Sequence, residues 1–137
     1  MSLPSPHEAL IYLMVITSAA DREMTDIEMA RIGNVLKTWP VFQDFDEWKL
    51  IRVAQECQQR LQAQDGLGAV LADVAQVLPE RLHDTAYAAA FEVATVDLEM
   101  RMEEVRVLEL IRDALEVDEA TIDAIERATK ARHRTLT

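Results

Sequence analysis

The amino-acid sequence predicts an all-α fold, a compact bundle of about seven helices, in one domain that spans residues 1–137. Three observations support this prediction. Glycine and proline, which interrupt helices, occur only 3 and 4 times, whereas strong helix formers such as Ala, Leu, Glu and Arg are plentiful. Apolar residues recur at helical rather than alternating spacing. Half of the residues are hydrophobic, which argues against disorder, and no linker or low-complexity segment divides the chain.

Two segments have no continuous polar face, which is typical of helices at the centre of a bundle. The first, residues 9–16 (ALIYLMVI), follows Ser5-Pro6, where serine suits the N-cap and proline the first helical position. The second contains residues 86–91 (AYAAAF). Its small alanine side chains would allow another helix to approach closely, so we expect it to pack at the centre as well.

Caps, breakers and amphipathic spacing predict the remaining helices. The second helix begins at residues 25–28 (TDIE), which have the form of a capping box, and Ile27 is expected on its buried face. Pro40 ends this helix, and Trp39 and Phe42 are expected to cover the end of the bundle. Gly66 is a candidate C-cap for the third helix. The later helices are expected from Asp44 or Asp46 onward, at 67–78, from Pro79 onward, at 101–115 and from Asp118 onward.

A pattern in the first half of the chain recurs at a spacing of 76 residues, the distance from Asp21 to Asp97. In both copies an apolar helix precedes an acidic turn and an amphipathic helix follows it. The acidic residues of the two turns match in three pairs: Asp21 and Asp97, Glu23 and Glu99, Glu28 and Glu104. The sequence therefore predicts a helix–acidic turn–helix unit that occurs twice, around residues 20–28 and 96–104.

The acidic turns are candidate sites for a divalent cation such as calcium, which binds six to eight oxygen atoms. The candidate metal ligands are Asp21, Glu23, Glu28, Asp97, Glu99 and Glu104. An EF-hand is excluded, because Asp26 stands where that loop needs glycine and Ile32 where it needs glutamate. A structural alternative is that Glu28 completes the capping box with Thr25. Arg101 replaces threonine in the second turn, which weakens that alternative for Glu104.

The direction of the two central helices decides whether the candidate ligands form one site. If these helices run parallel, both turns lie at one end of the bundle, and six carboxylates share one surface. If the copies are reversed relative to each other, the turns lie far apart, and each forms an incomplete site. The sequence leaves both arrangements open.

The charge balance limits the classes of partner. Twenty-five acidic and 14 basic residues give a net charge of −11, which disfavours nucleic acid and anionic membrane surfaces and favours a protein with a basic surface. Cys57 is the single cysteine, so no internal disulfide can form, and a reducing compartment is expected. The start of the sequence has no signal-peptide pattern, and the longest apolar run is too short to span a membrane. We therefore expect a cytoplasmic protein; a homo-oligomer stays open.

No constellation of residues indicates catalysis. Glu80 and His83 have the Glu-x-x-His spacing of a di-iron bundle, but that site needs two such motifs and two further glutamates, and the sequence has one motif. Cys57 lies on the apolar side of its predicted helix, so a packed thiol is favoured over a nucleophile. We expect a protein that is not an enzyme.

Residues 13–28 (LMVITSAADREMTDIE) resemble the acidic-turn motif of the TerB family, the tellurite-resistance protein TerB and its relatives. That motif is an apolar helix followed by Ala-Asp-Gly-Glu, an apolar residue, a small cap residue and glutamate. Residues 96–104 (VDLEMRMEE) and 113–115 (DAL) resemble the second copy. Arg22 and Leu98 stand where the family has glycine, and both resist the left-handed backbone that glycine permits.

The resemblance implies a bacterial protein with a bundle of about seven helices. It further implies a non-enzymatic role in resistance to tellurite and other stresses, within a larger assembly near the inner membrane that the chain would reach at most peripherally, through partners. Divalent metal is implied at the six carboxylates named above, and no other cofactor is expected.

Two hypotheses about function follow. In the first, the chain is an acidic binding or scaffold module whose turns hold a divalent cation or a basic partner. In the second, it is a purely structural protein–protein interaction domain, with no metal and no role in tellurite resistance, that makes contact through residues 39–45.

Overall fold

The computed structural model describes residues 2–20, 24–94 and 101–137. Within these ranges the chain forms seven α-helices and no strand, which confirms the all-α prediction. The α-helices are α1 (Pro6–Ser18), α2 (Asp26–Thr38), α3 (Leu50–Leu61), α4 (Gly66–Val77), α5 (His83–Ala94), α6 (Met102–Leu115) and α7 (Glu119–Arg132). Short 3₁₀ turns lie at Pro40–Phe42, Glu47–Lys49 and Glu80–Leu82.

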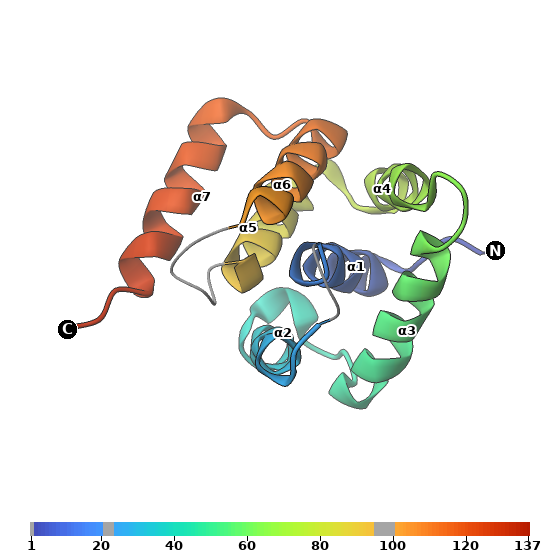
Figure 1. Cartoon of the computed structure of the whole chain (residues 1–137), viewed down its shortest axis with the longest axis horizontal. Helices are drawn as coiled ribbons and strands as arrows, with labels where there is room; N and C mark the ends of the chain where they lie inside the picture. Colours follow the sequence, from blue (N-terminus) through green and yellow to red (C-terminus); the bar gives the residue numbers. More distant parts are fainter. Residues whose placement is uncertain (1, 21–23, 95–100) are drawn as a thin grey trace.

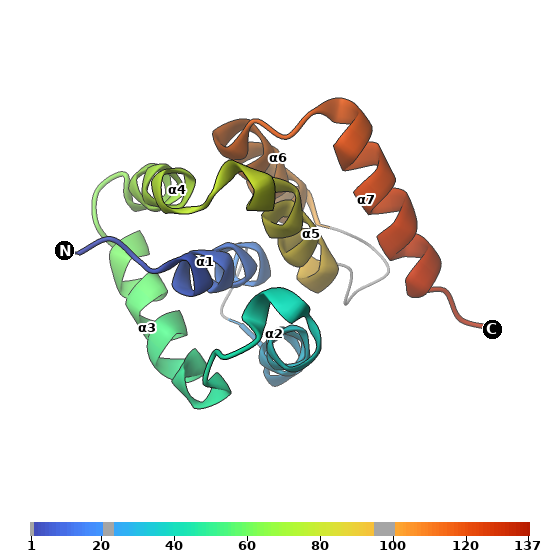
Figure 2. The same ribbon diagram turned by 180° about the vertical axis from the view of Figure 1, so that it is seen from behind.

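Helix α1 lies at the centre of the bundle, with α2, α3, α4 and α5 around it (Figure 1; Figure 2). Every residue of α1 from Ala9 to Ser18 is buried, because the helix has no polar face to turn toward water. Helix α5 packs along α1, and Ala86, Ala89 and Ala90 of α5 are fully buried. Their small side chains let the two backbones approach closely, as the sequence predicted.

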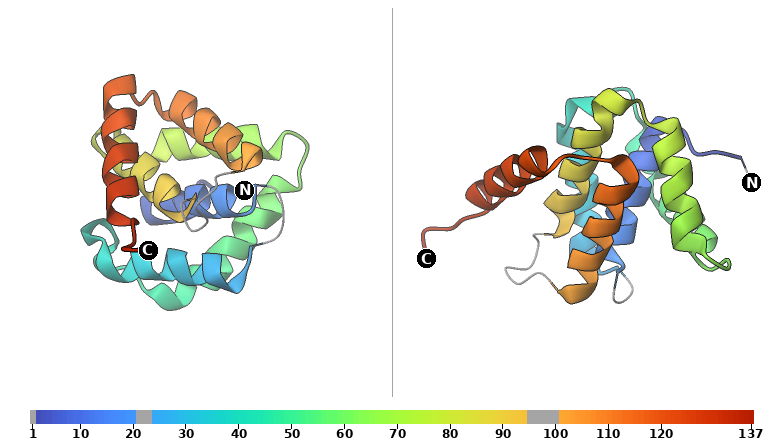
Figure 3. Two further views of the ribbon diagram at one scale, coloured as in Figure 1. Left: turned by 60° about the vertical axis from the view of Figure 1, so that its left-hand side comes forward. Right: turned by 90° about the horizontal axis from the view of Figure 1, so that it is seen from above.

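The two copies of the repeat have the same arrangement in space. Helices α1 and α5 pack against each other and run in roughly the same direction, and α2 and α6 both begin at the end of the molecule where α1 and α5 finish (Figure 3). We call this end, marked by Ser18, Ala94, Asp26 and Met102, the repeat end. Of the two arrangements that the sequence left open, the structure has the parallel one.

A histidine near the start of each central helix contacts the chain where the following repeat helix finishes. His7 Nε2 lies 2.9 Å from the carbonyl oxygen of Val41, just beyond α2. His83 Nδ1 lies 2.9 Å from the carbonyl oxygen of Leu115, the last residue of α6. His7 and His83 have the same spacing as Asp21 and Asp97. The repeat is therefore present in the tertiary contacts of these two histidines as well as in the sequence.

Side-chain caps begin several helices where the sequence predicted them. The hydroxyl of Ser5 accepts a hydrogen bond from the Glu8 backbone N–H at 3.1 Å, with Pro6 at the first helical position. Asp118 caps α7 by accepting from the Thr121 backbone N–H at 2.7 Å. The hydrogen bonds from Thr121 hold the pKa of Asp118 below its ordinary value. Such caps satisfy backbone donors that have no partner inside the helix.

Gly66 is not the C-cap that the sequence analysis expected. Helix α3 ends at Leu61, the residue with left-handed backbone is Asp65 (φ 54°), and Gly66 is the first residue of α4. A Cβ atom at Gly66 would lie 2.6 Å from the carbonyl oxygens of Arg60 and Leu61. Glycine is needed here for close approach of two backbones rather than for a left-handed turn.

Ile27 and the start of the fifth helix also differ from expectation. Ile27 is 67% exposed, because the capping box turns Glu28 inward, and the buried stripe of α2 consists of Glu28, Ile32, Val35 and Leu36. Pro79 has an extended backbone (ψ 141°) and precedes a 3₁₀ turn, so α5 begins at His83.

The segment after α2 closes one side of the bundle. Phe42 is buried, and its ring stacks on that of His7 with centroids 5.7 Å apart. Trp39 and Phe45 pack against the core, so the aromatics cover the core as predicted. No helix in the described ranges is long and apolar enough to cross a membrane.

Candidate functional site

The structure places two of the six candidate metal ligands. Asp21, Glu23, Asp97 and Glu99 lie outside the described residues. The two that it places are Glu28 and Glu104, each the third residue of a helix that begins at the repeat end. Each side chain belongs to a residue that is 4% exposed, so both carboxylates lie largely beneath the surface.

Glu28 closes a complete capping box at the start of α2. The Thr25 backbone N–H donates to Glu28 Oε1 at 2.8 Å, and the Glu28 backbone N–H donates to Thr25 Oγ1 at 3.1 Å. Two backbone donors at the helix start are thereby satisfied. The structural role that the sequence offered as an alternative for Glu28 is present in the fold.

Glu104 caps α6 in half of the same way. The Arg101 backbone N–H donates to Glu104 Oε2 at 3.3 Å. An arginine side chain has no hydrogen-bond acceptor, so Arg101 lacks the reciprocal bond that Thr25 makes in α2. The arginine at position 101, in place of threonine, weakened the prediction of a cap in the second turn. The cap forms nevertheless, because it uses the backbone of Arg101 and not its side chain.

The repeat end gathers oxygen atoms and negative charge. Asp26 and Glu103 are exposed in the first turns of α2 and α6. At the end of α1, the buried hydroxyl of Ser18 has no hydrogen-bond partner among the described residues. Carboxylate and hydroxyl oxygens suit calcium and magnesium rather than softer metals.

The described residues do not by themselves form a metal site. Each cap uses one oxygen of its glutamate, Glu28 or Glu104. Across the ranges that the structure describes, no three His, Cys, Asp or Glu side chains are grouped so as to hold a metal ion. Carboxylate oxygens are nevertheless the donor type that a hard cation prefers.

The residues that the sequence analysis considered for catalysis make structural contacts. The second ring nitrogen of His83, Nε2, lies 3.1 Å from the carbonyl oxygen of Leu78, so both nitrogens face carbonyl oxygens. The thiol of Cys57 is fully buried and lies 3.8 Å from the carbonyl oxygen of Tyr12. Burial raises the pKa of this thiol to about 12, which keeps it protonated and weakly nucleophilic at neutral pH.

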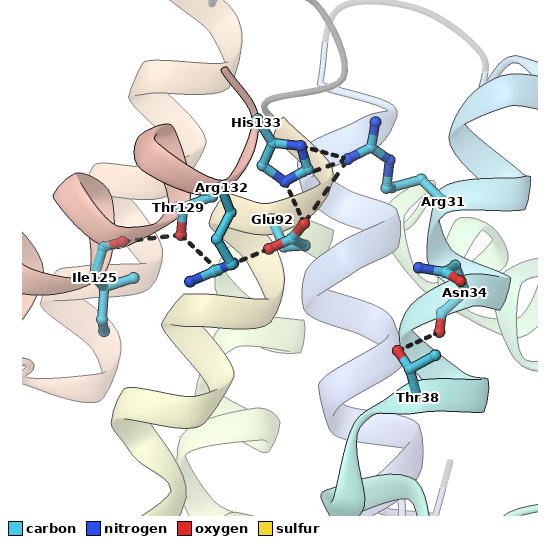
Figure 4. Close-up of polar contacts among 8 residues, drawn as sticks. All are labelled: Arg31, Asn34, Thr38, Glu92, Ile125, Thr129, Arg132 and His133. Atoms are coloured by element: carbon cyan, nitrogen blue, oxygen red, sulfur yellow. Dashed lines mark hydrogen bonds and ion pairs between the residues drawn. The ribbon is translucent and has the colours of Figure 1, made fainter. Parts of the chain in front are cut away.

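An ionic cluster forms around the buried side chain of Glu92, and it was not predicted from the sequence (Figure 4). Glu92 of α5 is 9% exposed; its Oε1 lies 3.0 Å from Arg132 Nη2, and its Oε2 contacts His133 Nε2 and lies 3.8 Å from Arg31 Nη1. The cluster joins α2, α5 and the end of α7. A signal was available, since Glu92 is the one charged residue in the apolar segment 86–94.

Exposed apolar side chains lie beside the 39–45 segment rather than in it. Trp48 is 88% exposed and Ile51 is 62% exposed, and they are one helical turn apart. A groove of about 540 Å³ next to Ile51 is also lined by Met24 and Met29. Large exposed apolar groups of this kind often mark a contact surface.

Comparison with known proteins identifies the family. The family model described as tellurite resistance protein TerB matches residues 7–127. No curated protein and no solved structure matches the sequence. The match covers most of the chain, including both copies of the repeat and all seven helices of the described ranges except the first residue of α1 and the end of α7. The chain therefore belongs to the TerB family.

Proposed function

We propose that this TerB-family chain is a non-enzymatic binding module whose working surface is the acidic repeat end, and that this surface takes up a divalent cation such as calcium or magnesium. The observation that supports the proposal is the convergence of the two repeat copies. Helices α2 and α6 begin at the same end (Figure 3). The first turn of each helix contains a buried glutamate, Glu28 or Glu104, and an exposed acid. A shared cation would offset the repulsion among these carboxylates.

A cation held by carboxylates of both repeat copies would also join the two halves of the folded protein. A ligand that binds the folded chain alone raises its stability in proportion to the logarithm of its concentration over Kd. In the same proposal, the loaded module acts in the bacterial cytoplasm, in stress responses that include tellurite resistance, and its acidic end docks a protein with a basic surface.

Calorimetric titration with calcium and with magnesium tests the cation. Three proteins are compared: the native chain, an Asp21→Asn/Asp97→Asn variant, and an Asp113→Asn/Asp123→Asn control. The control removes the same two charges from exposed positions on α6 and α7. We expect the native chain and the control to bind within about twofold of each other, and the turn variant to bind at least about tenfold more weakly. Equal binding by all three proteins, or no binding at millimolar cation, would reject the proposal.

A second candidate function is protein–protein interaction without a metal, favoured by the exposure of Trp48 and Ile51. Aromatic side chains such as that of Trp48 are enriched at interfaces, and the buried centre of an interface is more apolar than the rest of the surface. Sedimentation velocity would test self-association, with the native chain compared against Trp48→Ser/Ile51→Ser. A concentration-dependent dimer that the double substitution abolishes would support a homo-oligomer. A native chain that stays monomeric at all concentrations would reject it.

A further inference from the structure

A groove with a volume of about 920 Å³ opens between α6 and α7 over one face of α5. It exists because α7 packs on α5 but diverges from α6 (Figure 1; Figure 3). Tyr87 and Phe91 of α5 line it with stacked rings whose centroids are 6.2 Å apart. Leu108 of α6 and Ile122 of α7 add aliphatic walls. The volume lies in the range of small-molecule sites, roughly 300–1,000 Å³.

Basic side chains lie along this groove in a protein that is otherwise strongly acidic. Arg112 lines it from α6, Lys130 from α7 and Arg134 from the segment after α7. No ion pair within the described residues involves any of these three cations. With a net charge of −11 for the whole chain, nearby acids would be expected to pair with them. The three cations outnumber the two acids of the lining, Glu109 and Glu126, so the groove has the opposite sign of charge to the whole chain.

The two acids that line the groove are already engaged. The Tyr87 hydroxyl donates to Glu126 Oε2 at 2.8 Å, and Glu109 Oε2 lies 3.6 Å from Arg106 Nη1. Burial, followed by the bond to Glu126, raises the pKa of Tyr87 well above its ordinary value, so the phenol stays neutral and the floor uncharged. The groove thus combines an apolar floor with cations at its edge that form no ion pair with another described residue.

We propose that this groove binds a small amphiphile with a single anionic head group, of the fatty-acid class. The hydrocarbon chain lies on Tyr87, Phe91 and Leu108, where its burial is favourable because apolar surface leaves water. The carboxylate is held by Arg112 and Lys130 through charge-assisted hydrogen bonds. This ligand and its residues are separate from the cation at the repeat end, so the two proposals stand or fall independently.

The volume of the groove suits a small ligand, and its aromatic part is short. Tyr87 and Phe91 are four residues apart, so the aromatic floor extends over about one turn of α5, which is roughly 5.4 Å of helix. The walls extend further, since the lining runs from Val105 to Arg112 on α6 and from Ile122 to Lys130 on α7. An alkyl chain can therefore continue beyond the two rings along these walls, and the cations favour an anion over a neutral or cationic amphiphile.

Calorimetric titration with decanoate, below its micelle concentration, tests the proposal against decanol and decyltrimethylammonium as neutral and cationic analogues. The head-group variant is Arg112→Gln/Lys130→Gln. The matched control is Arg52→Gln/Arg127→Gln, which removes two cations from exposed ion pairs on α3 and α7 that do not line the groove. We expect decanoate to bind at least about tenfold more tightly than either analogue, and the head-group variant to lose at least about tenfold while the control changes less than about twofold.

Methyl NMR of the native chain locates the ligand. Shifts of the Leu108 and Ile122 methyl resonances on addition of decanoate support the proposal, and circular dichroism of both variants shows whether they remain folded. Equal affinity for the three amphiphiles, or equal loss in the two double variants, would overturn it. Binding of an acidic amphipathic peptide or of anionic vesicles without binding of free decanoate would also overturn it and assign the groove to another class of partner.

Discussion

Glu28 and Glu104 make the same contact in the two copies of the repeat, because each carboxylate accepts the backbone N–H of the residue three positions earlier. The donor is Thr25 at 2.8 Å in the first copy and Arg101 at 3.3 Å in the second. The same acid therefore starts a helix and adds negative charge to the repeat end. A substitution that keeps the hydrogen-bond acceptor and removes the charge can separate these two roles.

Replacing Glu28 with glutamine should separate the cap from the charge. A glutamine oxygen can still accept the Thr25 N–H, so Glu28→Gln should cost less than about 1 kcal/mol of folding stability, whereas Glu28→Ala leaves that donor without a partner and should cost about 1–3 kcal/mol. Both variants should bind calcium more weakly if the carboxylate is a ligand. Urea unfolding measures the first effect and calorimetry the second. An equal loss of stability in both variants would show that the charge, not the acceptor, stabilises α2.

Ala89→Leu should destabilise the protein, because Ala89 lies at the packed contact between α1 and α5. Ala89 is fully buried, and extra methylenes in a closely packed site typically cost about 1–3 kcal/mol. Ala88→Leu is the matched control, since Ala88 borders a shallow cavity of about 460 Å³ beside Ala124 and Ile125 and has room for the larger side chain. We expect it to change stability by less than about 0.5 kcal/mol. Thermal unfolding of both variants would test this, and equal melting temperatures would refute the central position of α5.

Removing the charge of Glu92 should loosen the end of α7. Loss of one member of a buried ion pair can cost about 3–5 kcal/mol, but Arg132 and His133 are partly exposed, so we expect about 1–3 kcal/mol for Glu92→Gln after solvent screening. Hydrogen exchange should show the loss of protection chiefly in α7. Asp123→Asn, which breaks the exposed pair with Arg127 on the same helix, should leave exchange nearly unchanged. Native-like protection of α7 in the Glu92 variant would contradict the anchoring role.

The sequence predicted the fold well because its strongest signals are local. A segment with no polar face, residues 9–16, can only be buried, and Ser5 and Asp118 cap helices through contacts within one turn. Predictions of burial were wrong where the preference of a hydrophobic residue for the core conflicted with the geometry of a helix cap. Ile27 is more hydrophobic than Glu28, yet Glu28 is buried because the capping box fixes the first turn of α2.

The sequence can indicate which residues belong to the candidate site, but it cannot indicate how they are arranged in space. The repeat spacing points to Glu28 and Glu104, but their position at one end of the molecule depends on how α1 and α5 pack. The groove is less accessible to sequence reasoning, because Arg112 and Lys130 are ordinary charges on two amphipathic helices. Their shared groove follows from the divergence of α7 from α6, which no local pattern encodes.

The buried thiol of Cys57 should make the protein less stable in alkali. Its pKa is 9.0 in the ordinary case and about 12 in the fold, because burial disfavours the thiolate. As the pH rises, the unfolded chain releases the thiol proton first, so stability is complete below pH 9 and is lost between pH 9 and 12. The slope of this loss approaches about 1.4 kcal/mol per pH unit.

Cys57→Ala should remove that part of the alkaline loss, so its stability should fall less steeply than that of the native chain between pH 9 and 12. Tyr87, whose pKa burial also raises, acts equally in both proteins. The pKa of Tyr12 is raised chiefly by burial and to a smaller extent by Cys57, so its contribution to the alkaline loss should fall slightly in Cys57→Ala. Val53→Ala is the control, because Val53 is a fully buried neighbour on α3 without a titratable group. It should lower stability by a constant amount at every pH. Urea unfolding over this pH range measures the slopes, and parallel curves for all three proteins would show that the thiol carries none of the alkaline sensitivity.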